Sequence, residues 1–389
     1  MLEKACQAYF PDLRDLCAMV ASFDCRSPYD PNAYAEAVLE EQLEEKRTVY
    51  ANVFFGVGVG AAVNGYLGCC SSTGFISVFN VDDLLSAGPD TDVVPALVIH
   101  AHDGAVYSLV THGGESLCSA GNDGRTVVWR ISDVVSAADA KNSESVKPAH
   151  VFVNPQASKP RGALGPVPET NALASDSTRG VLFSAAGDGV CYGWDLDDGG
   201  RATPAVNLRG HVDGLHCVAA RVGANQAVTG SEDGTVRIWD VRSEKTSHVV
   251  NPWAGTESSG STLRGVGGSH WVGCVALDGA ENWCAMGCGG GTVTMWSFAA
   301  GACASRVIAG RGTAIQAVKL TGEHVVAAGG EPTVFRWNLA GKLISRQPCG
   351  PESVFALDVS NAMTAVGGAG AVVDIFSAAG TKVATATCK

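Results

Sequence analysis

Two sets of residues in this sequence combine an imidazole, a hydroxyl and a carboxylate, the types that a hydrolase uses as base, nucleophile and orienting acid. Each set ends at a tryptophan. The residues are His102, Ser119, Asp123 and Trp129 in the first set, and His211, Thr229 or Ser231, Asp233 and Trp239 in the second. A catalytic set would occur once, whereas these types recur in the same order along the chain. We therefore interpret both sets as buried structural hydrogen-bond chains and predict no catalytic residue.

Two further patterns could suggest a ligand site, and both are weak. Residues 287–291 resemble a phosphate-binding loop, but neither a Lys-Ser/Thr pair nor a helix pattern follows them. Cys284 and Cys288, with His270 nearby, could be imagined as metal ligands, but no matching His/Cys set lies elsewhere in the sequence. None of the 14 cysteines forms a Cys-x-x-Cys motif. We therefore predict neither a metal site nor a cofactor.

The elements that must hold the two sets are repeats of a strand, a tight turn and a second strand. In residues 229–241, Glu232-Asp233-Gly234 form the turn, because Gly accepts positive φ and Asp bonds its own backbone. The pattern occurs seven times, each with an aromatic anchor: Phe79, Trp129, Trp194, Trp239, Trp296, Trp337 and Phe376. Gly-His followed later by Trp-Asp is the signature of a WD40 blade.

The repeats predict an all-β chain, a seven-bladed WD40 β-propeller over residues 49–389. One such sheet cannot bury both its faces alone, whereas neighbours in a ring cover each other. Residues 382–387 are expected to form the outer strand of blade seven. Residues 139–169, rich in Ser, Pro, Ala and Lys, are predicted to be a surface insertion. In blade six, Glu331-Pro332 replaces the usual Asp-Gly turn.

Residues 1–48 do not fit the repeat and predict a short N-terminal helical extension. Apolar side chains share one arc of the second predicted helix, opposite a row of glutamates. The residues that could dock a partner are Tyr34, Val38, Leu39 and Leu43. Two interpretations remain open, because an apolar arc must be covered by something. The helix either packs on its own propeller or docks on a helical partner.

Composition limits the classes of function. The hydrophobic fraction of 46% supports a large core, and the 48 glycines suit a chain with many tight turns. The net charge of −12 argues against direct binding of nucleic acid, because phosphate contacts need a basic surface. We therefore expect this chain to contact RNA only indirectly, through protein partners. We find no apolar run long enough to span a membrane and no signal peptide. We therefore expect an intracellular, reducing compartment.

Beyond the generic repeat, several stretches resemble the THO complex subunit 6 family. The matching residues are 48–54, 101–110, 168–173, 208–217, 271–274 and 372–376. The resemblance covers about everything from Thr48 onward, with departures in the loops at 86–95, 139–165 and 256–268. It implies a nuclear, non-catalytic subunit of the THO part of the transcription–export assembly, which packages messenger ribonucleoprotein for export. It also implies docking to other, coiled-coil THO subunits within a multi-subunit assembly.

A second interpretation of function comes from a single motif. Trp239, Asp240 and Arg242 form a Trp-Asp-x-Arg box. The box resembles one found in propellers that dock on the adaptor of cullin-4 ubiquitin ligases, which would make this chain a substrate receptor. Arg is also frequent at this position simply because the edge of a blade is solvated. The two hypotheses predict different partners, so co-purification would separate them.

Overall fold

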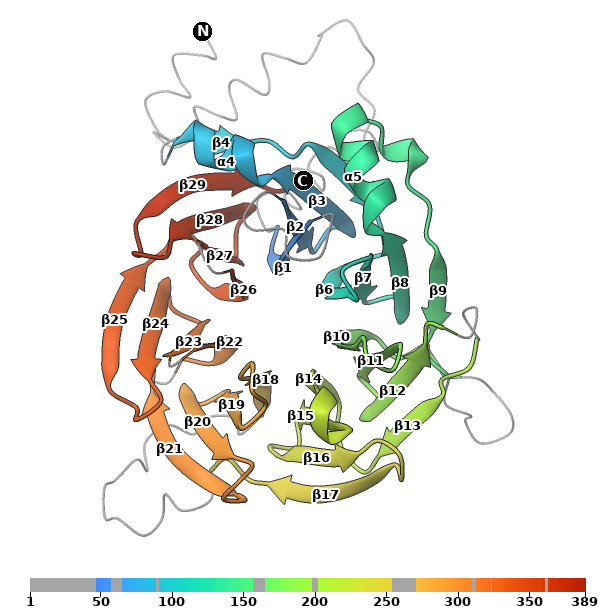
Figure 1. The fold of residues 1–389 in the computed structure, drawn as a ribbon, viewed down its shortest axis with the longest axis vertical. Coiled ribbons are helices and arrows are strands. Elements are labelled where there is room, and N and C mark those ends of the chain that lie inside the picture. Colours follow the sequence, from blue (N-terminus) through green and yellow to red (C-terminus); the bar gives the residue numbers. More distant parts are fainter. Residues whose placement is uncertain are drawn as a thin grey trace, which may run out of the picture. The chain divides into compact units, whose positions relative to one another are not determined.

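Seven antiparallel sheets follow one another along the chain and stand side by side around a central axis (Figure 1). The computed structural model describes residues 47–56, 65–88, 91–156, 165–197, 202–253, 271–309, 313–322, 324–360 and 363–389. Each sheet is one blade, and its first strand lies innermost. This arrangement confirms the predicted seven-bladed β-propeller. The predicted helical extension, with Tyr34, Val38, Leu39 and Leu43, lies outside the described residues.

Every blade is built from four strands, and one further short strand is added to blade seven. Blades one to three contain β1 (Val49–Phe55), β2 (Tyr66–Ser71), β3 (Phe75–Asn80) and β5 (Leu97–His100); β6 (Val106–His112), β7 (Ser116–Gly121), β8 (Arg125–Arg130) and β9 (His150–Val153); β10 (Thr170–Asp176), β11 (Val181–Ala186), β12 (Val190–Asp195) and β13 (Val206–Arg209). Blades four and five contain β14 (Leu215–Arg221), β15 (Gln226–Ser231), β16 (Val236–Asp240) and β17 (Lys245–Val250); β18 (Val272–Leu277), β19 (Trp283–Cys288), β20 (Thr292–Ser297) and β21 (Ala302–Ile308). Blades six and seven contain β22 (Ile315–Thr321), β23 (His324–Gly329), β24 (Thr333–Asn338) and β25 (Leu343–Pro348); β26 (Val354–Val359), β27 (Met363–Gly368), β28 (Val372–Ser377) and β29 (Lys382–Thr387).

The aromatic anchors fix the third strand of each blade. All seven are at most 8% exposed, and each stands opposite the second residue of the preceding strand. Trp129, for example, pairs with Leu117, and Trp239 pairs with Ala227. The turns before these strands close tightly because Gly124 and Gly234 adopt positive φ angles of 69° and 79°. The repeat therefore places one large ring at the same depth in every blade.

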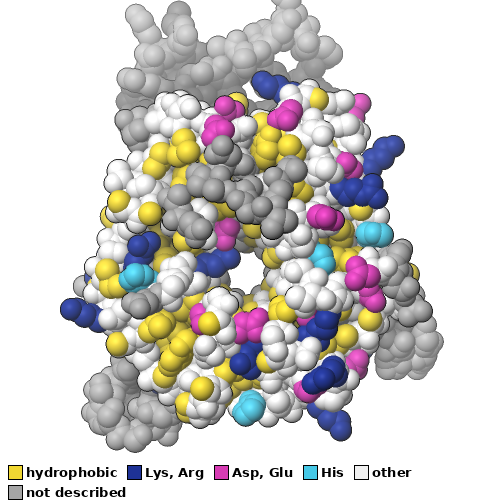
Figure 2. Space-filling model, viewed as in Figure 1, with side chains coloured by type: hydrophobic (Ala, Val, Ile, Leu, Met, Phe, Trp, Pro, Cys, Tyr) yellow, Lys and Arg dark blue, Asp and Glu magenta, His cyan; other side chains and the backbone are white. Residues whose placement is uncertain are grey.

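A β-bulge recurs at the start of every inner strand. In all seven blades the register between the first and second strands shifts across the second residue of the inner strand. A bulged residue is left out of the ladder, and its side chain is redirected. These second residues are all half-buried. Figure 2 shows an opening through the middle of the ring that the inner strands surround.

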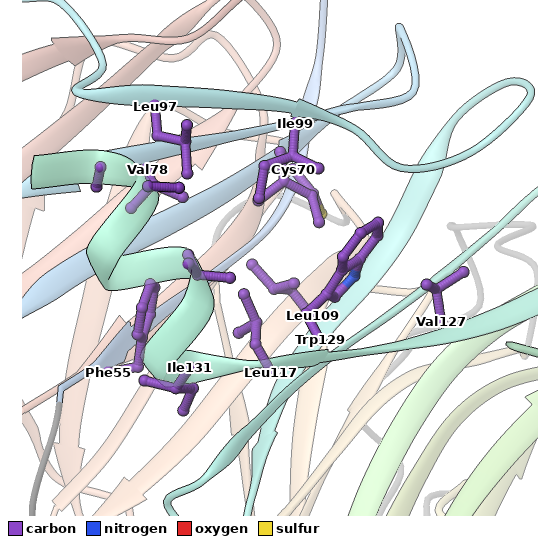
Figure 3. Close-up of a cluster of buried hydrophobic side chains, with 14 of the residues drawn as sticks. Phe55, Cys70, Val78, Leu97, Ile99, Leu109, Leu117, Val127, Trp129 and Ile131 are labelled. Carbon is purple, nitrogen blue, oxygen red and sulfur yellow. The ribbon is translucent and has the colours of Figure 1, made fainter. Parts of the chain in front are cut away.

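The predicted surface insertion over residues 139–169 is partly wrong, because it contains β9, the outer strand of blade two. The helix α5 (Ile131–Ala140) and a 3₁₀ turn (Ser143–Ser145) lead into this strand. Ile131 and Val134 of α5 are buried in the hydrophobic cluster shared by blades one and two, beside Trp129 and Leu117 (Figure 3). The helix thus covers apolar surface at the junction of the two blades.

Blade seven closes the ring with the end of the chain. β29 is its fourth strand and pairs with β28, which confirms the predicted outer strand over residues 382–387. The short strand β4 (Asp92–Val93) then adds to β29 in parallel, and the helix α4 (Val81–Ala87) contacts β29 as well. Blade one therefore sends its β3–β5 connection onto blade seven. Neither described helix is long and apolar enough to cross a membrane.

Candidate functional site

The structure brings each predicted hydrogen-bond set together at one edge of its blade. In blade two, His102 Nδ1 lies 2.9 Å from Asp123 Oδ1 and His102 Nε2 lies 2.9 Å from Ser119 Oγ. The indole N–H of Trp129 donates to the same Ser119 hydroxyl at 3.1 Å. The chain of contacts therefore links the loop before the inner strand to the turn and to the anchor.

Blade four repeats this geometry. His211 Nδ1 lies 2.8 Å from Asp233 Oδ2, and His211 Nε2 lies 2.9 Å from Thr229 Oγ1. Trp239 donates its indole N–H to Thr229 at 2.8 Å. Of the two hydroxyls that the sequence offered, Thr229 is the one in the set, whereas Ser231 donates to backbone carbonyls of the preceding loop.

Burial decides what these sets can do chemically. Ser119 and Thr229 are both 0% exposed, and each hydroxyl is already held by an imidazole and an indole. A nucleophile must reach a substrate, and neither of these hydroxyls contacts solvent. The geometry therefore supports the structural interpretation of both sets. The thiols of Cys284 and Cys288 are buried too, and burial raises the pKa of each to about 12. His270 lies outside the described residues.

Electrostatics within the blade-four set favour a neutral imidazole beside a carboxylate. Burial lowers the pKa of His211, against the opposing effect of Asp233. Burial alone would raise the pKa of Asp233, but hydrogen bonds from Thr235 and His211 outweigh it and hold the value at about 2. Asp233 also accepts backbone N–H groups from Val212 and Thr235. Its carboxylate therefore ties the turn to the neighbouring loop.

We expect Asp233→Ala to lower the free energy of unfolding by about 1–3 kcal/mol, because the imidazole and backbone donors would lose a buried partner. Asp123→Ala should behave alike, since Asp123 holds His102 and two backbone N–H groups. Glu331→Ala should cost less, because the sequence of blade six has Arg311 at the position of His102 and His211. Urea-unfolding midpoints of the three variants test this. Equal losses in all three would contradict the structural role of the sets.

The Trp-Asp-x-Arg box lies at the turn between β16 and β17. Trp239 is 1% exposed and belongs to the core between blades three and four. The Asp240 carboxylate accepts backbone N–H groups from Arg242 and Ser243, each at 3.0 Å. Arg242 itself is exposed. Within the box, the first residue thus serves packing, the second shapes the turn, and the third remains accessible to a partner.

Comparisons with known proteins extend this picture to most of the chain. A family model of the WD domain, the G-beta repeat, matches residues 94–130 and 202–240. These two segments contain the two complete hydrogen-bond sets. THO complex subunit 6 of Arabidopsis thaliana is 32% identical over 373 residues, which cover 92% of this chain and 96% of that protein. The chain belongs to the THO complex subunit 6 family.

Other relatives match smaller parts of this chain. THO complex subunit 6 of Homo sapiens is 28% identical over 304 residues, or 76% of this chain and 79% of that protein. A guanine nucleotide-binding protein subunit beta of Zea mays is 28% identical over 222 residues, or 49% of this chain and 57% of that protein. The family likeness suggested by the sequence motifs is therefore confirmed.

One buried polar site in this THO complex subunit 6 family member was not predicted. Asp374 of β28 is 1% exposed and lies 2.7 Å from the ammonium of Lys382 on β29. It also accepts the Gly350 N–H at 2.6 Å and the Thr385 hydroxyl at 3.3 Å. These contacts tie the last strand to its blade and to the preceding loop. A carboxylate two residues before the Phe376 anchor is the signal that could have revealed it.

Proposed function

We propose that this chain is a non-catalytic scaffold subunit of the nuclear THO assembly, which supports messenger ribonucleoprotein formation and mRNA export through protein contacts. The observation that carries the proposal is the 32% identity to THO complex subunit 6 of Arabidopsis thaliana across 92% of the chain. The buried hydroxyls of the two hydrogen-bond sets agree with a role without catalysis. The net charge of −12 agrees with contact to RNA only through other subunits.

The partners in this proposal are the other, helical THO subunits. Tyr34, Val38, Leu39 and Leu43 form the apolar arc that the sequence predicts for a docking helix. Such an arc would bury apolar surface against a partner helix, and that burial drives most protein association. An aspartate placed in the buried contact would lose its hydration without gaining a partner. The arc is therefore the segment to mutate first.

The alternative function, a receptor for a cullin-4 ligase, depends on one exposed residue. Arg242 offers a planar and permanently charged donor at the edge of blade four. In the structure, Asp240 also accepts hydrogen bonds within its own turn, so this residue of the box has a structural role that requires no adaptor. The two proposals therefore differ in which substitution abolishes partner binding.

We expect the double variant Leu39→Asp with Leu43→Asp to lose THO subunits in affinity purification, and Arg242→Ala to retain them. The measurement is mass spectrometry of proteins that co-purify with each tagged variant from nuclear extract. Both variants must first melt like the wild type. Lys245→Ala, a loss of charge at an exposed position beyond the same turn, is the matched control for Arg242→Ala.

The outcomes separate the proposals. If the double variant retains the THO subunits, the apolar arc is not the docking segment. If wild type brings down cullin adaptors instead, and Arg242→Ala alone loses them, the receptor function replaces the scaffold. If neither set of partners appears with wild type, the THO assignment fails.

A further inference from the structure

Three aromatic side chains meet at one side of the central opening. They are the bulged second residues of the inner strands of blades seven, one and two, namely Phe355, Tyr50 and Tyr107. The ring of Tyr50 stands edge-on to the ring of Tyr107 at 5.2 Å between centroids and to the ring of Phe355 at 5.7 Å. All three are half-buried. We call this group the aromatic arc.

The arc lies at the end of the opening that carries the turns between second and third strands. The hydroxyl of Tyr107 reaches Asn122 in the β7–β8 turn. The bulged residue of blade four, His216, likewise lies 2.6 Å from Glu232 in the β15–β16 turn and beside Trp271, with ring centroids 5.2 Å apart. The same register in each blade thus gathers these side chains at one mouth of the opening.

Carboxylates surround this mouth. Glu169 lies directly before β10 of blade three, next to blade two. Burial, then Tyr50 and Glu169, raise the pKa of Tyr107. Glu232 is 44% exposed, and its carboxylate lies 2.6 Å from the imidazole of His216. Among the described residues of the loops on this face, Arg47 and Lys389 are the basic ones, and Arg125 at the start of β8 lies 3.6 Å from Asp103. The carboxylates there are more numerous and include Glu169, Asp188, Asp213 and Glu232.

We propose that this mouth binds an arginine side chain on an extended segment of a protein partner. A guanidinium is planar and stacks on aromatic rings, and the arc gathers three half-buried rings at this mouth. Its permanent charge complements the carboxylates of Glu169, in the loop before blade three, and of Glu232, in the β15–β16 turn of blade four. An extended segment suits the site, because a ring mouth admits one side chain while the loops around it hold the backbone. Phosphate-bearing ligands would meet the same carboxylates with repulsion.

The test uses the purified full-length chain and a fluorescent peptide of glycine and serine that contains two arginines. Comparison peptides replace both arginines with citrulline, which keeps the shape and removes the charge, or with lysine. We expect saturable binding of the arginine peptide, at least about tenfold weaker binding of the other two, and weakening by salt. Fluorescence anisotropy measures the affinities.

Variants locate the site. Glu169→Gln with Glu232→Gln should weaken the arginine peptide by about tenfold or more, since both charges are lost while hydrogen bonding is kept. Tyr50→Leu should weaken it severalfold, because an apolar side chain remains without its π face. Glu115→Gln is the matched control, because this exposed carboxylate lies in the β6–β7 turn at the opposite ends of the strands. It should leave the affinity within about twofold.

Several results would overturn the proposal. These are no saturable binding by wild type up to about 1 mM peptide, equal binding of the citrulline or lysine peptide, or losses in Glu115→Gln that match those in the double variant. Melting curves exclude unfolding as the cause of a loss. The inference goes beyond the scaffold function, and because no THO subunit is present in the peptide assay, either can fail without the other.

Discussion

Replacing Ala386 with aspartate should prevent the ring from closing and leave little folded protein. Ala386 is 0% exposed in β29, where it stands opposite Val373 of β28 and pairs with Val93 of β4. It belongs to the apolar cluster that joins blades seven and one. An unpaired charge in such a place costs several kcal/mol, which approaches the whole stability of about 5–15 kcal/mol of an ordinary domain.

The same substitution on another outer strand controls for the added charge. Ala304 lies in β21, the outer strand of blade five, and is exposed. Ala304→Asp should unfold in urea within about 0.5 kcal/mol of wild type, as surface substitutions usually do. Soluble yield and urea-unfolding curves of the two variants provide the comparison. Similar curves for Ala386→Asp and wild type would show that β29 does not hold the ring closed.

The second large effect is expected from Trp239→Ala, which should lower the free energy of unfolding by about 3–5 kcal/mol. Trp239 is 1% exposed and packs with Phe183, Leu208 and Leu215 in the core between blades three and four. Its removal leaves a cavity and takes the indole donor from Thr229. Arg237 would also lose the ring that its guanidinium faces at 5.8 Å.

Trp239→Phe separates packing from hydrogen bonding. It keeps an aromatic ring in the core and loses only the N–H donor and part of the volume, so we expect a smaller loss than for alanine. Chemical unfolding monitored by circular dichroism measures both variants. If alanine and phenylalanine cost the same, the donor rather than the packing dominates. Because Trp239→Ala acts on the fold, its loss of partners would say nothing of docking, and Arg242→Ala is the informative variant.

The blade architecture could be predicted from sequence because its determinants are local and repeated. Each anchor, such as Trp194 or Phe376, occupies the same register in its strand, so the position of the anchor in the sequence predicts where the strands of its blade lie. The last strand was predictable because residues 382–387 directly follow the third strand of blade seven. The outer strand β9 was missed because of the composition of the residues around it. β9 is four residues long, and its apolar Val151 and Phe152 stand in a stretch rich in Ser, Pro and Ala.

Among the site residues, those within one repeat could be predicted and those from distant segments could not. The partners of His102 and His211 lie within one repeat, so spacing along the chain was enough to propose them. The aromatic arc joins Phe355 to Tyr50 and Tyr107, from opposite ends of the sequence. Their meeting depends on ring closure and on a bulge in each strand, and neither leaves a local signal. Asp374 was visible in the sequence as a carboxylate two residues before its anchor, but its partner Lys382 comes close only through the pairing of β28 with β29.

The way in which blade seven is completed has a consequence for synthesis of the protein. β29 is synthesised after β26, β27 and β28, yet it carries the buried Ala384 and Ala386 that cover the closing junction. Until those residues emerge, the apolar partners Val373 and Ile375 of the preceding strand have no cover on that side. A sheet edge in this condition is prone to association with other chains. We therefore expect the nascent ring to remain open, and prone to association, until β29 has left the ribosome.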